Sequence, residues 1–527
     1  MRAMTRIIGI IFVLSILTSV FAACKKNGTE NVDTTSDDTK ADVSDVGTED
    51  NREYDDKGYL KDTVGEQDFG GKEIRILGWS ERYYKEFGIK PEDVQETTLG
   101  QQVYKRDLQT QKRLNVKLAV VTEAGNNGNY KKSYIPKAET MVTGNEVDAF
   151  ACYSMAATPL MLRGYLVNLL DQPYLNFDDP WWSADIVERA SIYDRLYFAT
   201  GSISPSYLAQ GFSMYFNKSM ADTYLTDALE SFDAETLYDM VDNNTWTIDN
   251  FITLAKTVEI SGAEKTADET YGYVLRTVSY DPWLFSAGIV TLDNAVDGSL
   301  QISEGWNSSK VISLAEKLLS LLNSKSGGAA VDRSSTSYTF ESAWKNGRSL
   351  FMTSSLYDLT TWVKNENPVT EDGVGILPMP KWDSTQTDYL STAGFYFTLW
   401  GICRSSDRQD ATAATLEVLS SEGYRTTEPA LYDEVLKIKS TDGAGSSNDR
   451  RMIDFVRDSI VIDAGRIHNN DIHTYGWGMF RNSIMDDIIN GSSASSYSTF
   501  FASRNEQLRA DVNTLNSTMQ MIEEVYG

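Results

Sequence analysis

Short apolar runs alternate with longer segments of helical spacing through residues 72–152. The runs at 72–79, 116–121 and 147–152 have the length and composition of buried strands. Between them, the segments 95–114 and 130–142 place apolar residues at helical spacing, the second with an interruption at Pro136. Strands that alternate with helices favour a parallel sheet with crossover helices, so the pattern predicts the α/β class.

The pattern changes after residue 190. Strands are expected at 193–198 and 212–217, on either side of a connector at 201–205 that contains Gly201 and Pro205 and is a candidate hinge or crossover. No internal repeat is visible. Further helices are expected at 248–258, 307–322, 411–421, around Leu431, at 450–458 and at 503–525, and a strand closed by prolines is expected at 375–380.

The first 24 residues have the layout of an export signal. A basic start with Arg2 and Arg6 precedes an apolar run and then small residues. The run is short for a membrane-spanning helix, which needs roughly 20 residues. Ala22-Ala23-Cys24 resembles a bacterial lipobox, whose cysteine is lipidated and becomes the new N-terminus, although Phe21 stands where that motif usually has Leu. An ordinary secretory signal with an incidental Cys24 is the alternative.

We therefore expect residues 1–23 to be a signal peptide and Cys24 to anchor the protein, extracytoplasmically, to the outer face of the bacterial cytoplasmic membrane. Residues 24–69 are rich in Asp, Glu, Thr, Ser and Gly and poor in large apolar residues. Such a segment cannot bury enough surface to offset its chain entropy. It is expected to be a disordered acidic tether, with folding beginning near Gly70 and Gly71.

Charge and size narrow the class of protein. The chain has 527 residues, 41% of them hydrophobic, which is enough for a large core divided into two or more lobes. Its net charge of -27 argues against nucleic-acid binding and against direct adsorption to anionic lipid, because both need clustered Lys and Arg. The expected membrane contact is therefore the lipid alone.

Cysteine and aromatic residues add two further points. Besides Cys24, only Cys152 and Cys403 are present; both stand in apolar runs, where buried free thiols are typical, and a disulfide between them stays open. The chain has 11 Trp and 28 Tyr against two His. Because Trp and Tyr combine a flat apolar face with a hydrogen-bonding edge, this content suits an amphipathic ligand, although many of these rings must be core.

Four segments resemble elements of the carbohydrate-type extracellular solute-binding proteins (family 1) of bacterial ABC importers. They are the opening strand ending in Gly78-Trp79, the sequence Tyr215-Phe216-Asn217-Lys218, the stretch 340–351, and 375–380. Ser355 departs from the pattern, where the family often has Gly ahead of its stacking aromatic. The resemblance implies a bilobal periplasmic-binding-protein-like fold, in which two three-layer α/β lobes joined by a hinge clamp a ligand. Lobe 1 would comprise 70–203 with 390–440, and lobe 2 would comprise 204–389 with 441–527.

Aromatic platforms beside carboxylates are the residue types that a sugar site needs. Trp79 and Tyr153 follow strands, at the sheet edge where ligand crevices of open α/β sheets form, but they could also pack between lobes. Trp181 and Trp182 follow a turn, and we expect one to be buried and Trp182 to line the site. The resemblance places Trp283 at the cleft, with helix-staple packing as the alternative. Tyr357, Asp358 and Tyr396 complete the predicted ligand-binding set.

The candidate metal-binding residues have simpler structural explanations. Asp293, Asp297 and Glu304 occupy EF-hand-like positions, but Ala295 replaces a ligand and Asp297-Gly298 predicts a hairpin turn instead. The five-residue gap between the two histidines, at positions 468 and 473, does not place them on one helical face. No nucleophile-elbow, P-loop, dinucleotide-binding or zinc-protease motif is present, and no metal or cofactor is expected.

Together with the export signal, the resemblance implies a non-enzymatic, monomeric, lipid-anchored receptor that captures a mono- or oligosaccharide and delivers it to the permease subunits of an ABC transporter. The alternatives are an exported glycoside hydrolase, which needs two carboxyl groups about 5–10 Å apart across a cleft, and the same fold with a peptide or cationic solute as ligand.

Overall fold

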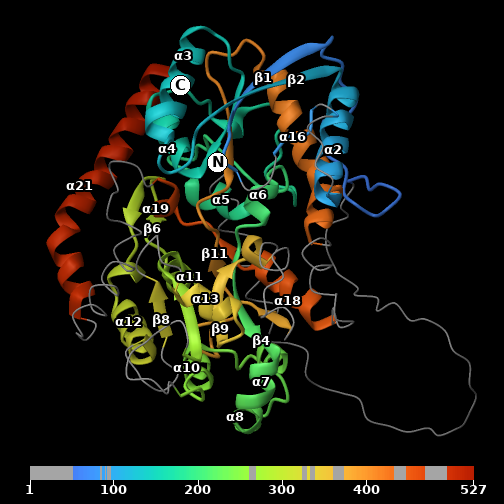
Figure 1. The fold of residues 1–527 in the computed structure, drawn as a ribbon. Coiled ribbons are helices and arrows are strands. Elements are labelled where there is room, and N and C mark those ends of the chain that lie inside the picture. The colour runs from blue at the N-terminus through green and yellow to red at the C-terminus, as the bar shows by residue number, and fades with distance from the viewer. Residues whose placement is uncertain are drawn as a thin grey trace, which may run out of the picture. The chain divides into compact units, whose positions relative to one another are not determined.

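The computed structural model describes residues 52–82, 86–89, 91, 97–259, 269–322, 329–332, 339–359, 373–432, 447–468 and 495–526 (Figure 1). The predicted signal peptide, Cys24 and the first part of the predicted tether lie outside these residues. Within the described part of the chain, no helix combines the length and apolar character needed to cross a membrane.

The first sheet is four-stranded, in the order β12-β3-β1-β2. β1 pairs in parallel with β2 and β3, and β12 is antiparallel to β3. The three parallel strands therefore end at one edge, with Trp79 opposite Glu123 and Tyr153 one strand away. The strands are β1 (Lys72–Trp79), β2 (Val116–Glu123), β3 (Ala149–Tyr153) and β12 (Thr398–Ile402).

Helices cover both faces of this sheet, with α2 and α16 on one side and α3 and α4 on the other (Figure 1). α2 begins after Thr97, whose side chain accepts from the Gly100 N–H, and it ends at Asn115 in the left-handed region (φ 48°). The helices are α2 (Thr98–Leu114), α3 (Ile135–Thr143), preceded by the π-helical turn η2 (Tyr130–Tyr134), α4 (Ser154–Leu162) and α16 (Gln409–Arg425).

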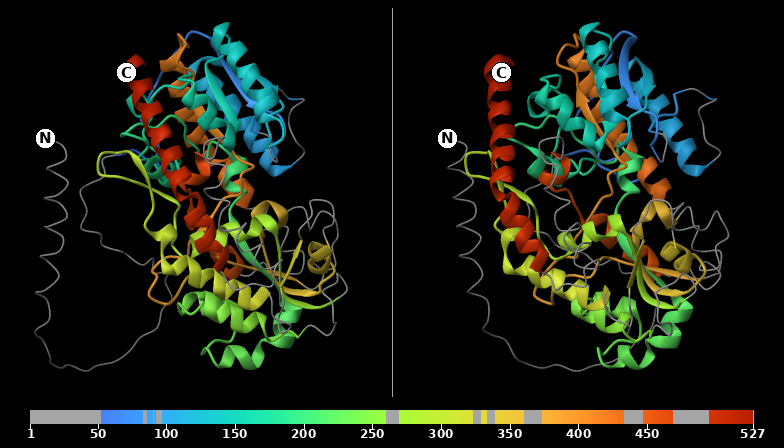
Figure 2. Two further views of the ribbon diagram at one scale, coloured as in Figure 1. Left: turned by 90° about the vertical axis from the view of Figure 1, so that its left-hand side faces the viewer. Right: turned by 60° about the vertical axis from the view of Figure 1, so that its left-hand side comes forward.

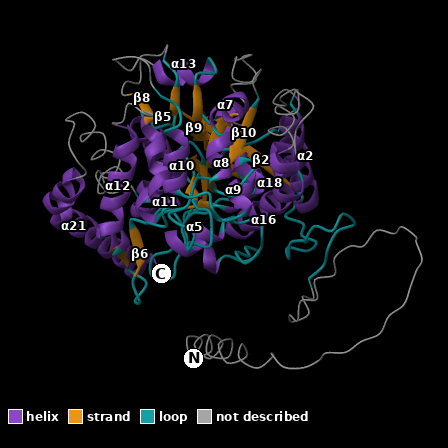
Figure 3. Ribbon diagram, turned by 90° about the horizontal axis from the view of Figure 1, so that it is seen from below, coloured by secondary structure: helices purple, strands orange, loops and turns teal. Residues whose placement is uncertain are grey.

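The second sheet has the order β10-β4-β9-β5-β8, and helices surround it (Figure 3). β9, β5 and β8 are parallel, whereas β4 is antiparallel to both β9 and β10. Its strands are β4 (Phe212–Asn217), β5 (Tyr271–Arg276), β8 (Ala329–Asp332), β9 (Ser349–Ser355) and β10 (Val374–Leu377). Its helices are α7 (Lys218–Tyr224), α8 (Thr226–Glu230), α9 (Leu237–Asp242), α10 (Ile248–Ala255), α12 (Ser309–Leu322), α13 (Thr339–Lys345) and α18 (Ser447–Asp458).

α12 illustrates why the helices around the second sheet turn one face to the core. Val311, Leu314, Leu318 and Leu321 recur at helical spacing and are all buried. Each such side chain contributes about 1.5–3 kcal/mol when it leaves water, so the apolar stripe fixes the face that the helix turns to the core.

Three chain segments connect the two sheets. Gly211 pairs with Ala393, and β11 (Ser391–Thr392) pairs with β13 (Ile460–Val461). We call the segments 199–211, 391–397 and 459–467 the first, second and third connecting segments. Gly201 of the first is required by close approach, since a Cβ there would lie 2.1 Å from the Trp181 carbonyl oxygen.

The remaining elements pack around the two sheets and their helices. The predicted hairpin is confirmed: β6 and β7 are antiparallel, with Gly298 at φ 81° in the turn. The C-terminal helix α21 runs beside α4, which covers the first sheet, and beside α12, which packs near the second sheet (Figures 1 and 2). The elements are η3 (Leu169–Asp171), α5 (Ala184–Ala190), α6 (Pro205–Leu208), η4 (Thr277–Tyr280), α11 (Asp281–Ser286), β6 (Leu292–Asn294), β7 (Leu300–Ile302), η5 (Gly305–Asn307), α19 (Ala464–Ile467) and α21 (Ser495–Tyr526).

One expected strand is wrong. Residues 193–198 are irregular, and two isolated bridges, from Ile192 to Arg195 and from Ala199 to Trp400, replace the predicted ladder. Tyr193 and Asp194 both adopt positive φ, which turns the chain back within the predicted run.

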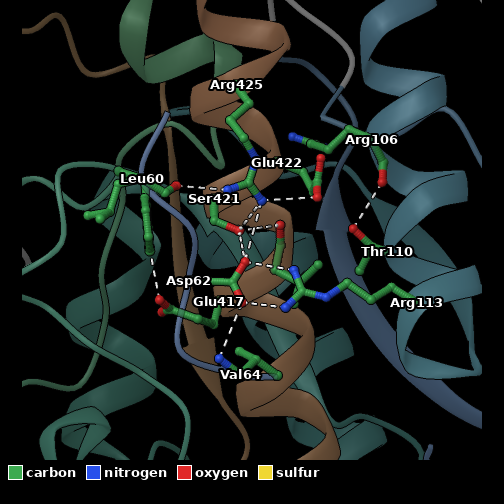
Figure 4. Close-up of polar contacts among 12 residues, drawn as sticks. Leu60, Asp62, Val64, Arg106, Thr110, Arg113, Glu417, Ser421, Glu422 and Arg425 are labelled. Atoms are coloured by element: carbon green, nitrogen blue, oxygen red, sulfur yellow. Dashed lines mark hydrogen bonds and ion pairs between the residues drawn. The ribbon is translucent and has the colours of Figure 1, made fainter. Parts of the chain in front are cut away.

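The predicted tether is also wrong over residues 54–69, which pack against α2 and α16 beside the first sheet. Leu60 and Val64 are buried, and the Asp62 carboxylate accepts two hydrogen bonds from Arg113, at 2.6 and 2.7 Å (Figure 4). Ser421 of α16 adds a third at 2.7 Å. Burial opposes ionisation of Asp62, but these hydrogen bonds and the two nearby guanidinium groups outweigh it and lower its pKa to about 2. The composition of this segment predicted disorder, because composition cannot show that the buried Asp62 carboxylate binds side chains of both α2 and α16.

Candidate functional site

Three of the predicted aromatic residues meet at the carboxyl edge of the first sheet. The ring centroids of Trp79 and Tyr153 are 5.2 Å apart, those of Tyr153 and Tyr396 are 5.5 Å apart, and those of Trp79 and Tyr396 are 6.1 Å apart. We call Trp79, Tyr153 and Tyr396 the aromatic edge. Trp79 and Tyr153 are buried, while Tyr396 is half-buried. Tyr396 is therefore the ring of the three that presents surface, and the other two support it.

Polar contacts fix the aromatic edge from below. The Trp79 indole donates to Thr398 Oγ1 at 2.9 Å. Glu81 accepts from the Gly125 N–H at 2.6 Å and from Asn129 at 3.0 Å, which holds the loop after β2 against Trp79. A Cβ at Gly125 would lie 2.6 Å from the Trp79 Cβ, so only glycine permits this approach.

Two other predicted residues meet at the carboxyl edge of the second sheet, with a different chemistry. The Asp358 carboxylate accepts from Ser354 at 2.6 Å, from Ser355 at 3.0 Å and from Arg276. The Arg276–Asp358 pair is partly solvent-exposed, with side-chain exposures of 26% and 16%. We call Arg276, Tyr357 and Asp358 the polar edge. Burial and the Asp358 charge both raise the pKa of Tyr357, so its hydroxyl stays protonated and can donate.

The connecting segments join the two edges. The Tyr357 N–H donates to the Ala209 carbonyl at 2.9 Å, and the Gly394 N–H donates to the Gln210 carbonyl at 2.8 Å. Gln210 is buried, and its Nε2 has no hydrogen-bond partner among the described residues. Sequence reasoning missed Gln210, although a lone amide within the apolar run 207–216 was a signal.

Arg466 is a second residue that sequence reasoning missed. Its guanidinium forms an ion pair with Asp281 at 2.9 Å, donates to the Ala393 carbonyl at 2.7 Å and lies 4.1 Å from the Phe395 ring centroid. These contacts tie the third connecting segment and α11 to the second connecting segment, one residue before Tyr396. No periodic pattern marks such a residue, because its partners are remote in sequence.

Trp182 lies elsewhere. The indoles of Trp181 and Trp182 donate to the two oxygens of Glu417, at 3.0 and 2.9 Å. Burial of Glu417 raises its pKa to about 8, against the opposing effect of these hydrogen bonds. Trp182 lines a cavity of about 530 Å³ beside the first and third connecting segments, together with Trp181, Tyr207, Tyr424, Glu428 and Arg457.

Trp283 lies in the hydrophobic core between the second sheet and its helices. It is fully buried, donates to the Tyr273 hydroxyl at 3.0 Å and packs 5.1 Å from Phe251. The structure brings it to neither edge. Sequence could not separate it from Trp79, since both stand near the end or start of an element and differ only in what covers them.

The cysteines and acidic loops supply no metal site in the part of the chain described. Cys152 and Cys403 are buried free thiols. Across these residues, no group of three His, Cys, Asp or Glu side chains is placed to hold a metal ion. His468 is buried, and His473 lies outside the described residues.

Sequence comparison finds no match to a family model or to a curated protein. Structural comparison does. The GacH receptor of Streptomyces glaucescens, solved unliganded and with acarbose, has a TM-score of 0.51 and 14% identity, over 84% of this chain and 99% of that one. The fold is that of the bilobal solute-binding proteins.

Two further solved structures agree on the fold. The galacto-N-biose-/lacto-N-biose I-binding protein of the Bifidobacterium longum ABC transporter has a TM-score of 0.54 at 11% identity. The maltose-binding periplasmic protein MalE of Listeria monocytogenes has a TM-score of 0.52 at 14% identity. Both cover 84% of this chain and 98% of the other. The predicted fold class is thereby confirmed.

Proposed function

We propose that this chain is a carbohydrate-binding receptor that holds a mono- or oligosaccharide between the aromatic edge and the polar edge and delivers it to the permease of an ABC transporter. The observation that carries the proposal is the position of these edges. Each lies at the carboxyl ends of parallel strands, where ligand crevices form in open α/β sheets. The polar edge adjoins the first connecting segment through Tyr357, Tyr396 lies in the second, and the Gly394–Gln210 hydrogen bond joins these two segments.

The chemistry of the two edges suits a sugar. A sugar ring presents C–H faces, which pack on an aromatic ring, and hydroxyl groups, which pair with carboxylate, guanidinium and phenol groups. Tyr396 supplies the half-buried ring, and Arg276, Tyr357 and Asp358 supply donors and acceptors. The solved neighbours were crystallised with acarbose, lacto-N-biose and maltose, which supports the same class of ligand.

Binding would act through hinge closure. A ligand that contacts both edges stabilises the conformations in which they are close, and its differential affinity sets the population shift. The connecting segments 199–211, 391–397 and 459–467 are the hinge in this account. Lobe 1 contains the first sheet, and lobe 2 contains the second sheet. The permease recognises the closed form, and no bond of the ligand is broken.

The location proposed is the outer face of the bacterial cytoplasmic membrane, with lipid at Cys24 as the anchor. The basic start, the short apolar run and Ala22-Ala23-Cys24 support it. A Cys24→Ser variant should be released from membranes as soluble protein. Release of the wild type to the same extent would remove the anchor from the proposal and leave the binding function standing.

A thermal-shift panel tests the binding function. The full-length protein would be melted alone and with glucose, maltose, maltotetraose, lacto-N-biose, a tripeptide or spermidine. A ligand at a hundredfold excess over its Kd stabilises the folded state by about 2.7 kcal/mol, which raises the Tm measurably. We expect at least one sugar to do so. A shift with the tripeptide or spermidine but with no sugar would contradict the proposal, and so would release of reducing ends from maltotetraose.

A further inference from the structure

Glu86 is a fully buried carboxylate that lies outside the two edges. It belongs to the chain between β1 and α2, and its side chain reaches the first connecting segment and the first residue of β12. Its Oε1 accepts from Thr398 Oγ1 at 2.8 Å, from Ser204 Oγ at 3.2 Å and from Ser206 Oγ. One oxygen thus gathers three hydroxyl groups from two segments that are about 190 residues apart in sequence.

Each of the three hydroxyl oxygens also accepts a hydrogen bond from an N–H group. Thr398 Oγ1 accepts from the Trp79 indole at 2.9 Å, and Ser206 Oγ accepts from the Thr398 N–H at 3.2 Å. Ser204 Oγ accepts from the Tyr207 N–H at 3.4 Å as the cap of α6. Each hydroxyl therefore keeps its own proton to donate, and Glu86 Oε1 is an acceptor within reach of all three. Ser206 Oγ also lies 3.2 Å from Ser204 Oγ and 3.3 Å from Thr398 Oγ1.

Two guanidinium groups influence this carboxyl. Arg82 follows β1 and Arg106 belongs to α2, where it pairs with the buried Asp107 at 2.8 Å and donates to the Glu86 carbonyl. Burial raises the pKa of Glu86, while the Ser206 and Thr398 hydrogen bonds and the two guanidinium charges oppose the rise. Oε2 is buried and has no hydrogen-bond partner among the described residues, so Oε1 alone makes the hydroxyl contacts.

We propose that Glu86 is a positioning residue: its Oε1 orients the hydroxyls of Ser206 and Thr398 and, through Thr398, fixes the Trp79 indole beneath Tyr396. The part that concerns ligand affinity rests on the proposed function. The part that concerns Trp79 does not, because the hydrogen bonds are present without a ligand.

Removing the Glu86 acceptor should change the orientation of the Thr398 hydroxyl and, through it, that of the Trp79 indole. Without Oε1, the Thr398 hydroxyl loses its acceptor at 2.8 Å and keeps only the longer contact of 3.3 Å with Ser206 Oγ, so the indole loses a partner of fixed orientation. Trp79 then no longer holds the Tyr153 and Tyr396 rings in one arrangement. The affinity for a stacked ligand falls although no residue that contacts it has changed.

The test compares Glu86→Gln, which keeps an oxygen at the acceptor position, with Glu86→Leu, which removes it. The first readout is the Trp79 indole N–H resonance in a 15N–1H spectrum of the full-length protein, assigned by its absence in Trp79→Phe. We expect Glu86→Gln to leave this resonance close to its wild-type position and Glu86→Leu to move it. An unchanged resonance in Glu86→Leu, or equal displacement in both variants, would overturn the proposal.

The second readout is calorimetric titration with maltose. If maltose binds the wild type, we expect Glu86→Leu to weaken binding about tenfold and Glu86→Gln by less than threefold, with the conservative change acting as the rescue. Equal weakening by both variants would contradict the positioning role. If maltose does not bind the wild type, the resonance still decides the role of Glu86, so the two proposals fail separately.

A third variant covers the case in which Glu86→Leu does not fold. Thr398→Val replaces the linking hydroxyl by a methyl group of similar size and should move the Trp79 resonance by itself. In that background, Glu86→Ala, which also removes the acceptor, should move it no further. A further displacement of the same resonance would show that Glu86 does not act through Thr398 and would overturn the proposal.

Discussion

The two strand edges of the candidate site differ in how their side chains are held. The aromatic edge consists of ring contacts, and the buried indole of Trp79 uses its single donor internally on Thr398. The polar edge consists of an ion pair and two serine hydrogen bonds around Asp358, with all three residues partly exposed. The first edge can offer mainly the apolar face of Tyr396, and the second can offer exchangeable donors and acceptors.

This difference indicates how the work of recognition would divide. Stacking on Tyr396 depends on area and is tolerant of the ligand's hydroxyl pattern. Hydrogen bonds to Arg276, Tyr357 and Asp358 depend on that pattern and provide selectivity. Substitutions at the two edges should therefore change affinity and selectivity to different degrees.

Asp62→Asn should have the largest effect, and on stability alone. It leaves Arg113 and Arg425 without their buried carboxylate, which costs roughly 3 kcal/mol in the free energy of unfolding. Because Asp62 lies at neither edge, sugar affinity should stay within twofold of the wild type. Urea unfolding and calorimetric titration measure the two quantities, and a loss of affinity as large as the loss of stability would break the separation between fold and site.

The same clamp predicts a pH dependence. The pKa of Asp62 in the folded protein, about 2, lies below its ordinary value of 3.8. Its stabilising contribution is thus present above pH 3.8 and is lost as the pH falls toward 2. The stability difference between wild type and Asp62→Asn should shrink through this window, whereas a constant difference would contradict the ion-pair account.

Tyr396→Ala should have the largest effect on binding. Removing the half-buried ring costs about 2 kcal/mol of binding free energy, or roughly a 30-fold rise in Kd. Tyr396→Phe keeps the ring and should stay within threefold. The ratio of Kd values for two sugars that differ at one hydroxyl should be nearly unchanged in Tyr396→Ala. A large change in that ratio would show that the aromatic edge contributes to selectivity and would contradict the division between the two edges.

Asp358→Asn should have a smaller effect on affinity and a larger one on selectivity. It removes the charge that pairs with Arg276 and should raise Kd about tenfold, equivalent to about 1.4 kcal/mol. The ratio between the two sugars should change. Asp383→Asn, which changes a partly exposed carboxylate that accepts from Thr385 in a bend, is the matched control and should alter neither quantity.

Tyr357→Phe should have the smallest effect. It removes one hydroxyl and keeps the ring, so Kd should rise about threefold, or less than 1 kcal/mol. The change should again appear in the sugar ratio. An effect larger than that of Asp358→Asn would indicate that Tyr357, rather than the ion pair, is the principal polar contact.

Sequence reasoning reached the fold and part of the site, for physical reasons. β1, β2 and β3 are buried apolar runs separated by helical patterns, so both their type and their common edge could be predicted. Trp79 and Tyr153 end two of these strands, which is why they could be placed together. Tyr396 joins them through the second connecting segment, as the predicted set allowed.

The remainder depends on contacts between remote segments. Gln210, Arg466 and Glu86 owe their positions to the crossing of the connecting segments, which no local pattern encodes. The same holds for the ordering of residues 54–69 by Arg113 and α16. Whether a tryptophan lines a site or fills a core depends on what covers it, and that separates Trp283 from the aromatic edge.

The central claim is that one ligand contacts both edges, and a double-mutant cycle by isothermal titration calorimetry tests it most directly. The sugar that gives the largest thermal shift would be titrated into wild type, Tyr396→Ala, Asp358→Asn and the double variant. We predict 1:1 binding to the wild type, weakening in each single variant, and the weakest binding in the double variant. Wild-type affinity in both single variants, together with weakening on Trp182→Ala, would place the ligand in the cavity beside Trp181 and Trp182 and contradict the account.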